Sequence, residues 1–223
     1  MRYAIYYLPE EDSALWKFGS SVIGYDSVSG FLVGHPSLGA GVDVATATTE
    51  PRTYGFHATL KAPFRLAEGA SEEGLLSAAA RYAASERSIP IGALEVRALG
   101  GFVALVPGCN EALSAFAGRC VQAFASFRAP MTADERARRL RSPLTPRQTE
   151  LMDAWGYPYV FDEFCFHMTL TSSLPLHSLT RLRDALARAY SPLSTRLVVS
   201  SLCVCVQPPQ GRFKLLERFP LGA

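Results

Sequence analysis

The sequence lacks the marks of several large functional classes. Its 22 basic and 20 acidic residues leave a net charge of +2, which is too even a balance to predict bulk affinity for nucleic acid or a membrane surface. No apolar run approaches the length that crosses a bilayer. The segment Met1–Pro9 has the pattern of a strand and not of a signal peptide. We therefore expect a cytoplasmic protein with no membrane partner.

Cysteine is scarce, and the common metal and nucleophile motifs are absent. The five cysteines include no Cys-x-x-Cys pair. Cys203 and Cys205 alternate along a probable strand, so we expect them to face one side of a sheet as small hydrophobes, in a reducing compartment. The sequence has no His-x-His, no His-Glu-x-x-His and no Gly-x-Ser-x-Gly. We accordingly predict no metal, no cofactor and no serine nucleophile.

One pentapeptide, Phe-His-x-Thr-Leu, occurs twice and contains half of the four histidines. The two copies are Phe56–Leu60 and Phe166–Leu170. On a strand, residues i and i+2 face the same side, so His57 shares a face with Thr59, and His167 with Thr169, while the apolar members face the other way. A lone histidine on a strand is most simply a core residue bonded to backbone. The repeat favours a functional pair instead.

The repeat extends beyond the pentapeptide. In the first half, the pattern predicts a helix from Ser71 and then a hairpin over 94–106. In the second half, it predicts a helix capped by Ser178 and then a hairpin over 197–219. The interval from each motif histidine to the turn of its hairpin differs by one position between the halves. This indicates an internal duplication of about ninety residues or somewhat less.

The duplication predicts the fold class. We expect an α+β fold in which two antiparallel sheets, with helices on their outer faces, are related by a pseudo-two-fold axis. The chain is interpreted as a single domain over 1–223, with lobes over about 1–107 and 108–223. A strand near Tyr3–Leu8 leads into the first lobe, and a helix capped by Asn110 leads into the second.

The segment over about 131–163 has no counterpart in the first half. Thr132 opens a capping-box pattern for a short basic helix, and Thr145 and Pro146 open a second helix that we expect to end at Gly156. Two interpretations of this insertion stay open. It is either a solvated connector with a charged face, or a lid whose arginines or tyrosines touch an anionic substrate.

Two imidazoles and two hydroxyls that face one another suit an anion with oxygen ligands. One neutral imidazole would deprotonate water, and the other, protonated, would protonate the leaving oxygen. Each proton transfer of this kind contributes about 10²–10⁴-fold to the rate. The hydroxyls and a nearby cation would hold the nonbridging oxygens. Which histidine is the acid stays open, because the duplication is symmetric.

These motifs resemble a known family. Two His-x-Thr-Leu motifs in duplicated halves are similar to the 2H phosphoesterase superfamily, which includes RNA 2′,3′-cyclic phosphodiesterases of the LigT type. The string Tyr54–Phe64 is similar to the DUF1045 branch, which is associated with phosphonate-utilisation operons. The resemblance covers nearly the whole chain. It implies a bilobal fold with His57, Thr59, His167 and Thr169 lining a cleft between the lobes, and metal-independent hydrolysis of a cyclic or related phosphodiester.

Further residues are candidates for substrate binding. Arg52, Tyr54 and Lys61 are in phase with the first motif histidine, and Tyr6 on the first strand would form a wall of the cleft. A solvated Lys, a surface Arg and a packed Tyr are the alternatives. The other charged or titratable residues near these segments are most simply surface residues: His35, Arg65 and His177.

The sequence thus predicts a phosphoesterase that acts on a small phosphorylated substrate as a monomer. One alternative is an RNA 2′,3′-cyclic phosphodiesterase, which would bind single-stranded RNA with strong salt dependence. The segment Thr171–Ser173 stands where RNA-processing relatives place an Arg, and this disfavours RNA. Another alternative is a nucleotide- or phosphate-binding module that has kept the site without turnover.

Overall fold

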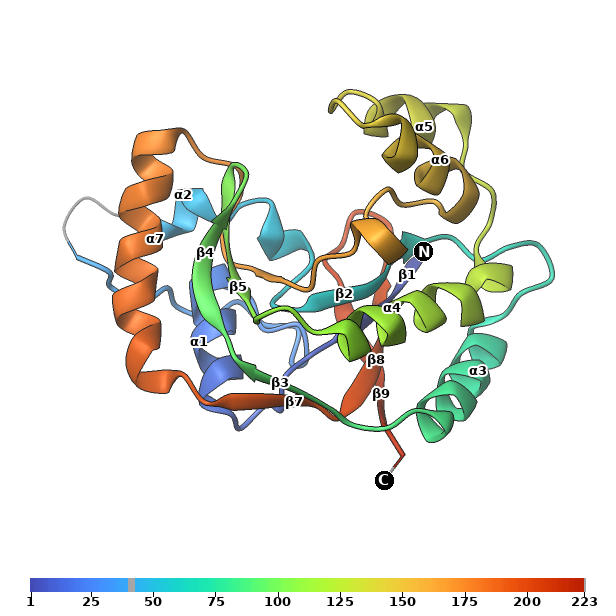
Figure 1. Ribbon diagram of the computed structural model, residues 1–223, viewed down its shortest axis with the longest axis horizontal. Coiled ribbons are helices and arrows are strands. Elements are labelled where there is room, and N and C mark those ends of the chain that lie inside the picture. Colours follow the sequence, from blue (N-terminus) through green and yellow to red (C-terminus); the bar gives the residue numbers. More distant parts are fainter. Residues whose placement is uncertain (40–42, 223) are drawn as a thin grey trace.

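The computed structural model describes residues 1–39 and 43–222. Seven antiparallel strands form one sheet in the order β4-β5-β6-β2-β1-β8-β9, and β3 pairs with β7 in a second, two-stranded sheet (Figure 1). The strands are β1 (Arg2–Tyr7), β2 (Ala58–Phe64), β3 (Ile89–Ala93), β4 (Glu95–Leu99), β5 (Phe102–Val106), β6 (Met168–Thr169), β7 (Arg196–Val199), β8 (Ser201–Gln207) and β9 (Lys214–Pro220).

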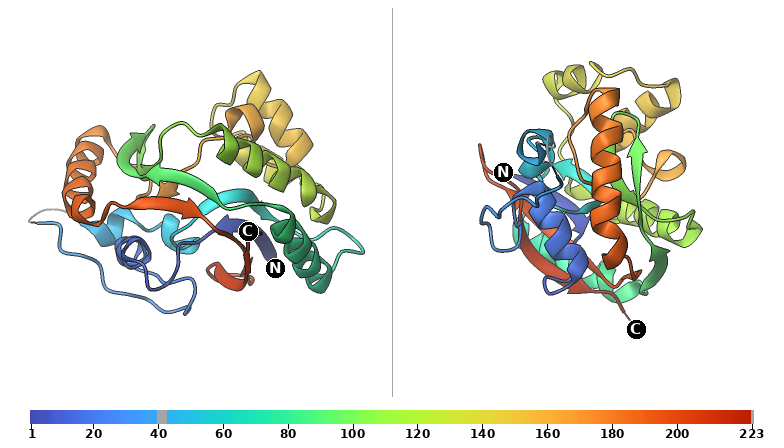
Figure 2. Two further views of the ribbon diagram at one scale, coloured as in Figure 1. Left: turned by 60° about the horizontal axis from the view of Figure 1, so that its bottom comes forward. Right: turned by 90° about the vertical axis from the view of Figure 1, so that its left-hand side faces the viewer.

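Helices α3, α4 and α7 lie against this large sheet. Helix α3 packs on β8 and β9, α4 on β2, and α7 on β4 and β5. Helices α1 and α7 lie beside each other (Figure 2), and Phe18 of α1 contacts Tyr190 of α7. The helices are α1 (Ala14–Ile23), α2 (Val44–Ala47), α3 (Glu72–Ser85), α4 (Glu111–Ala123), α5 (Ala133–Arg139), α6 (Pro146–Trp155) and α7 (Leu176–Tyr190). No helix in these described ranges has the length and apolar character needed to cross a membrane.

The predicted helix starts are largely confirmed. Ser71, Asn110, Thr132 and Thr145 cap their helices, and in each case the side-chain oxygen accepts a bond from a backbone N–H of the first turn. Helix α7 is the exception, because it begins at Leu176 after Pro175, so the prediction that Ser178 caps it is wrong.

The predicted α+β class with antiparallel sheets is confirmed, but the strands are distributed differently. The two motif strands, β2 and β6, lie next to each other and pair at Ala58 and Met168. This contact joins what we expected to be two separate sheets into one. On one side of the junction the order is β2-β1-β8-β9, and on the other it is β6-β5-β4.

The halves of the chain also exchange hairpins across this junction. Hairpin β4–β5, from the first half of the sequence, pairs with β6 from the second half. Hairpin β8–β9, from the second half, pairs with β1 from the first. Strand pairing therefore crosses residue 107, and the division into lobes over 1–107 and 108–223 stays a prediction about the repeat.

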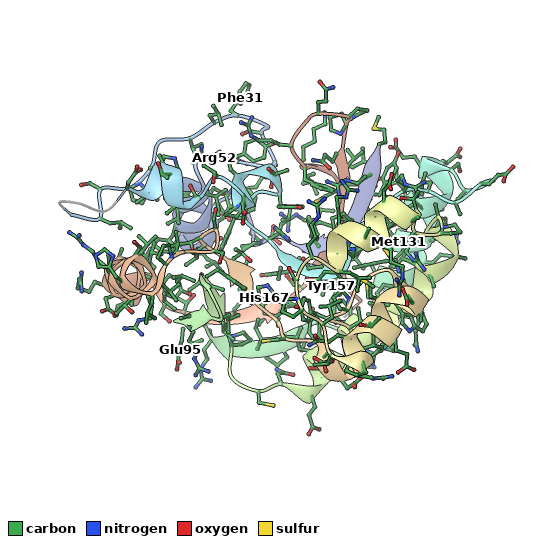
Figure 3. The ribbon with its side chains drawn as sticks, turned by 90° about the horizontal axis from the view of Figure 1, so that it is seen from above. Phe31, Arg52, Glu95, Met131, Tyr157 and His167 are labelled. Carbon is green, nitrogen blue, oxygen red and sulfur yellow. The ribbon has the colours of Figure 1, made fainter. Side chains whose placement is uncertain are left out.

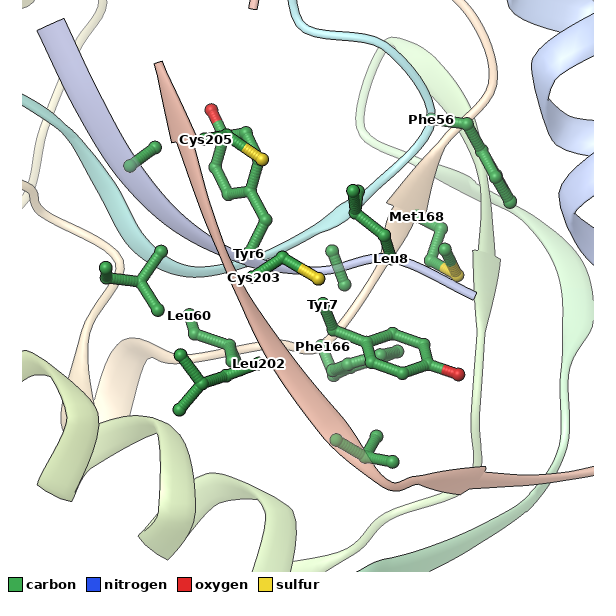
Figure 4. Packing of buried hydrophobic residues seen from close by; sticks show 14 of the residues in the cluster. Tyr6, Tyr7, Leu8, Phe56, Leu60, Phe166, Met168, Leu202, Cys203 and Cys205 are labelled. Atoms are coloured by element: carbon green, nitrogen blue, oxygen red, sulfur yellow. The ribbon is translucent and has the colours of Figure 1, made fainter. Parts of the chain in front are cut away.

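The period of two within each motif decides which side chains enter the core. Phe56, Leu60, Phe166 and Met168 are buried in the main hydrophobic cluster, where Figure 4 shows them among residues of β1 and β8. Cys203 and Cys205 are buried in the same cluster as free thiols. The apolar faces of both motifs thus anchor the strands, and their polar faces are left for the site.

The insertion forms a small helical unit of its own. Helix α5 has the predicted capping box, α6 has one as well, and α6 ends as expected at Gly156, which is in the left-handed conformation. Leu151 and Val160 pack with Val121 of α4 in a second hydrophobic cluster. Figure 1 shows α5 and α6 above α4.

Candidate active site

The two motif histidines have the same local geometry. Each immediately precedes its strand, His57 before β2 and His167 before β6. His57 Nδ1 lies 2.9 Å from the carbonyl oxygen of Gly55, and His167 Nδ1 lies 2.8 Å from that of Cys165. Both histidines therefore bond to the residue two positions before them, so the duplication extends to the orientation of each ring.

This bond decides the tautomer of each neutral imidazole. A carbonyl oxygen only accepts, so Nδ1 carries the hydrogen and Nε2 has a free lone pair. His57 Nε2 lies 3.2 Å from Thr59 Oγ1, whose hydroxyl can donate to it. In both copies the nitrogen able to take up a proton is the one turned away from the backbone.

Both histidines line one cavity of about 330 Å³. Thr59 and Thr169 line it as well, as the shared strand face requires. Seen from above in Figure 3, Tyr157 of the insertion lies near His167, and both line the cavity. The other lining residues are Arg2, Tyr6, Glu50, Pro51, Tyr54, Ala62, Pro63, Phe102, Arg139, Thr171 and Ser173.

Burial disfavours the charged form of both imidazoles. Desolvation lowers the pKa of His57 from 6.5 to about 4, against the hydrogen bond to Gly55, which raises it, and the neighbouring His167 adds a smaller decrease. Desolvation also lowers the pKa of His167, again against its backbone bond to Cys165. Both imidazoles are therefore neutral at pH 7 in the free protein, and each has a lone pair available as a base.

Two of the predicted binding residues lie where the sequence placed them. The Tyr6 ring stacks on the His57 imidazole and lines the cavity. Tyr54 also lines it, and its ring stacks on that of Phe213 with 5.6 Å between centroids. These aromatic rings give the cavity an apolar part beside the His57 imidazole.

The prediction that Lys61 shares the face of His57 is wrong. Tyr6 pairs with Thr59, but Ile5 pairs with Lys61, so β2 has one extra residue at this point, a β-bulge. The bulge turns Lys61 to the core side, where it is 3% exposed and its Nζ donates to the Val121 carbonyl oxygen at 3.0 Å. Desolvation lowers its pKa from 10.5 to about 8.

Arg52 also lies outside the cavity, contrary to the alternation we expected. A 3-10 turn over Pro51–Thr53 interrupts the extended chain before the motif. The Arg52 guanidinium instead donates to the carbonyl oxygens of Ile23 and Ala45. It also donates to Nε2 of His35, which is half-buried and not a plain surface residue. In Figure 3 Arg52 lies well away from His167.

The two remaining histidine and arginine predictions have different outcomes. His177 is exposed, as expected. Arg65 is half-buried at the strand exit, where it pairs with Glu135 of the insertion at 3.2 Å. The surface interpretation of Arg65 is therefore incomplete, because its guanidinium fastens the insertion to the end of β2.

Two cavity residues that carry positive charge, Arg2 and Arg139, were not named among the predicted substrate-binding residues. Arg2 stands four positions before Tyr6 on β1, so the strand period could have placed Arg2 on the same face as Tyr6. Arg139, at the end of α5, and Tyr157 come from the insertion. No local pattern links Arg139 to the motifs, because only tertiary packing brings α5 over the site.

The described residues contain no group of three or more His, Cys, Asp or Glu side chains that could hold a metal ion. The polar groups at the site are imidazoles, hydroxyls and guanidiniums, together with the carboxylate of Glu50. Guanidiniums and hydroxyls bind anionic oxygen, and the imidazoles can exchange protons with it. This arrangement is suited to acid–base chemistry on an oxyanion.

The chain is similar in sequence to one described family and to two curated proteins. Residues 59–214 match the family model described as "Protein of unknown function (DUF1045)". Over 177 residues, 78% of this chain and 39% of the relative, it is 42% identical to a protein of Janthinobacterium sp. (strain Marseille) named ribose 1,5-bisphosphate phosphokinase PhnN. Over 218 residues, 95% of this chain and 49% of the relative, it is 35% identical to a protein of the same name from Laribacter hongkongensis (strain HLHK9).

The chain thus spans between 39% and 49% of the length of these curated relatives. Among solved structures, it is similar to E. coli LigT complexed with 3′-AMP, at 12% sequence identity and a TM-score of 0.39. That alignment covers 100% of this chain and 98% of LigT.

Proposed function

The chain belongs to the DUF1045 family, and we propose that it is a 2H-type phosphoesterase that hydrolyses a small cyclic or sugar-linked phosphodiester without a metal. The single observation that carries this proposal is the pair of motif histidines in one cavity. His57 and His167 bond through Nδ1 to equivalent carbonyl oxygens, and this leaves Nε2 of both without a hydrogen and able to accept a proton. Two equivalent imidazoles around one substrate supply a base and an acid for hydrolysis.

The proposed reaction needs one proton removed and one delivered. One imidazole takes a proton from water as the water oxygen bonds to phosphorus, and the other gives a proton to the ester oxygen as its bond to phosphorus breaks. The product is a phosphate monoester and a free hydroxyl. Thr59 and Thr169 donate to nonbridging oxygens, and the guanidiniums of Arg2 and Arg139 offset their negative charge.

The low pKa values of the free site are compatible with this scheme. Burial keeps both imidazoles neutral before the substrate arrives. A bound phosphodiester anion favours a nearby cation, so it raises the pKa of the adjacent imidazoles. One proton taken up from solution on binding would then convert one of the two bases into the acid. Substrate orientation decides which one.

The relatives' names suggest the metabolic setting. Both proteins are named as kinases of ribose 1,5-bisphosphate, under a name used in phosphonate utilisation. The chain contains no Gly-Lys pair and so has no G-x-x-x-x-G-K-[ST] phosphate-binding loop. We therefore propose a small phosphorylated sugar as the substrate class, in phosphonate catabolism, and do not extend the kinase activity to this chain. A monomeric state and a cytoplasmic location stay predictions.

A phosphorus NMR screen of cyclic phosphodiesters, including ribose 1,2-cyclic and nucleoside 2′,3′-cyclic phosphates, tests the proposal. We expect His57→Ala and His167→Ala each to lower turnover by about 10²–10⁴-fold. His177→Ala is the matched control, because His177 is exposed and outside the cavity. Near wild-type turnover in His57→Ala or in His167→Ala would contradict the proposal. Loss of activity on chelation, restored by zinc, would contradict its metal-independent part.

A further inference from the structure

A second hollow of about 270 Å³ adjoins the candidate active site and is lined by arginine. Arg2, Tyr54, Pro63 and Arg139 line both hollows, so the two are continuous. The charged groups of the second hollow are Arg2, Arg65, Arg128, Arg138, Arg139 and Glu135.

Only one of these arginines is neutralised. Arg65 pairs with Glu135, and the pKa of that carboxyl is lowered to about 2, so the pair stays ionised at neutral pH. No ion pair within residues 1–39 and 43–222 includes Arg2, Arg128, Arg138 or Arg139. The hollow therefore has an excess of positive charge over its walls.

Neutral groups hold several of these guanidiniums in place without cancelling their charge. Arg2 Nε donates to Gln207 Oε1 at 2.8 Å, and Arg128 Nη2 donates to the carbonyl oxygen of Ala154 at 3.1 Å. Arg139 lies over the ring of Tyr157 at 5.4 Å. Arg136, one turn earlier on the same helix as Arg139, is instead paired with Asp153.

The first half of the chain and the insertion both contribute to this hollow. Arg2 comes from β1, Arg128 lies between α4 and α5, and Arg138 and Arg139 end α5. Because Arg65 binds Glu135 of α5 on one wall, the insertion is held where its arginines face the cleft. This position favours the lid interpretation of the insertion over that of a solvated connector.

We infer that this arginine-lined hollow binds a second phosphate group of the substrate, a phosphate monoester carried on the sugar away from the reacting phosphodiester. Guanidinium groups match phosphate oxygens through paired hydrogen bonds, and a monoester carries more negative charge than a diester. Arg2 and Arg139 would lie between the two phosphates. This inference rests on the proposed function for the identity of the first phosphate, and it deepens the substrate class.

Calorimetry on the wild-type protein tests the second subsite without turnover. Ribose 1-phosphate and ribose 1,5-bisphosphate differ by one phosphate monoester and contain no diester to hydrolyse. Charge-assisted hydrogen bonds of about 1.5–3 kcal/mol correspond to roughly tenfold or more in affinity. We expect ribose 1,5-bisphosphate to bind at least about tenfold more tightly than ribose 1-phosphate.

Two arginine variants locate the effect. Arg138→Gln should reduce the affinity ratio of the two probes several-fold, because Arg138 lines the hollow and has no carboxylate partner among the described residues. Arg141→Gln makes the same change of charge three positions away, outside the hollow, and should retain the wild-type ratio. Equal losses in both variants would indicate a general charge effect and overturn the inference.

The remaining outcomes separate this inference from the proposed function. Equal affinity for the two probes, or no binding of ribose 1,5-bisphosphate, overturns the second subsite even if cyclic phosphodiesters are hydrolysed. A preserved affinity ratio with no turnover of any diester leaves the subsite standing and defeats the proposed function. Tighter binding of an RNA oligonucleotide with a 2′,3′-cyclic end than of ribose 1,5-bisphosphate overturns the assignment to a small sugar.

Discussion

The ring of Tyr6 lies on the imidazole of His57, with 3.9 Å between the centroids and 26° between the planes. Tyr6 is 1% exposed, and its hydroxyl is buried with no hydrogen-bond partner among the described residues. The ring face and not the hydroxyl is therefore what supports the histidine. Together with the Nδ1 bond to Gly55, the stacking restrains the imidazole on two sides.

Two variants at Tyr6 separate these contributions. We expect Tyr6→Phe to raise the free energy of unfolding by about 1 kcal/mol, because it removes a buried hydroxyl that has no partner. Tyr6→Leu should lose more turnover than Tyr6→Phe, because it removes the ring that orients His57. Urea denaturation and steady-state kinetics measure the two effects. A destabilised Tyr6→Phe would show that the hydroxyl has a bonding partner in solution.

Anion binding should depend on pH through the motif histidines. The pKa of His57 is about 4 in the free protein, and a bound anion raises it. At a pH between the pKa of the free protein and that of the complex, anion binding is therefore accompanied by proton uptake. The affinity for sulfate, which stays fully charged over this range, should fall as pH rises from 5 to 8, by up to about tenfold per pH unit for each proton. Calorimetry in two buffers of different ionisation enthalpy measures the proton uptake.

The control for this linkage is His57→Gln together with His167→Gln. The other charged groups lining the same cavity are Arg2, Arg139 and Glu50. The arginines stay protonated over this range, so the double variant should lose most of the proton uptake. Sulfate affinity that is independent of pH in the wild-type protein would contradict a shared proton at the site.

Folding stability should decrease in mild acid because of His57. The unfolded chain binds a proton with a pKa near 6.5, whereas the folded state binds it only near pH 4. Stability from this group is therefore complete above pH 6.5, is lost as pH falls toward 4, and changes no further below that. The difference in free energy of unfolding between wild type and His57→Gln, measured by denaturation across pH 4–8, should follow this course. A flat difference would show that the imidazole is solvated in the folded protein.

Lys61→Met tests the bulge in β2. Lys61 is buried, and its Nζ contacts the Val121 carbonyl oxygen and the ring of Phe64 but no carboxylate among the described residues. Methionine should therefore fill the space without the cost of burying an ammonium group. The pKa of Lys61 is about 8, against 10.5 when solvated, so wild-type stability should rise between these pH values. The variant should lack that rise, be at least as stable near pH 7, and retain turnover.

A direct contact between Lys61 and the substrate would give a different result for Lys61→Met. If Lys61 contacted substrate, Lys61→Met would raise KM strongly with little change in stability. Lys61→Arg provides a second measurement, because its larger guanidinium should not fit the buried position under α4 and should destabilise the protein.

Much of the site could be predicted from short segments. His57 and Thr59, and their counterparts His167 and Thr169, could be paired because neighbours two apart on a strand share a face. The capped helix starts could be predicted for a similar reason, since a cap is a bond between residues three apart in the chain. Tyr6 was expected only as a wall of the cleft from the first strand, and it lines the cavity.

Where prediction failed, the cause lay outside the local pattern. Lys61 was misplaced because a bulge set by pairing with β1 shifts the period of β2 by one residue. Arg52 was misplaced because it lies in a 3-10 turn that begins at Pro51, and its guanidinium donates hydrogen bonds to carbonyl oxygens of other segments. Arg139 was expected near a substrate only under the lid interpretation of the insertion, because no local pattern shows that α5 packs over the site.

The sequence by itself determined the two half-sites and the chemistry they offer, because each half-site is built from residues within a few positions of one another. Only the tertiary structure decided that β2 and β6 pair directly, that the hairpins exchange, and that Arg2 and Arg139 meet at the same cavity. The physical reason is that strand register and helix docking depend on burial of apolar faces between distant segments. The residue spacing within one segment does not determine which distant segment its apolar face will pack against.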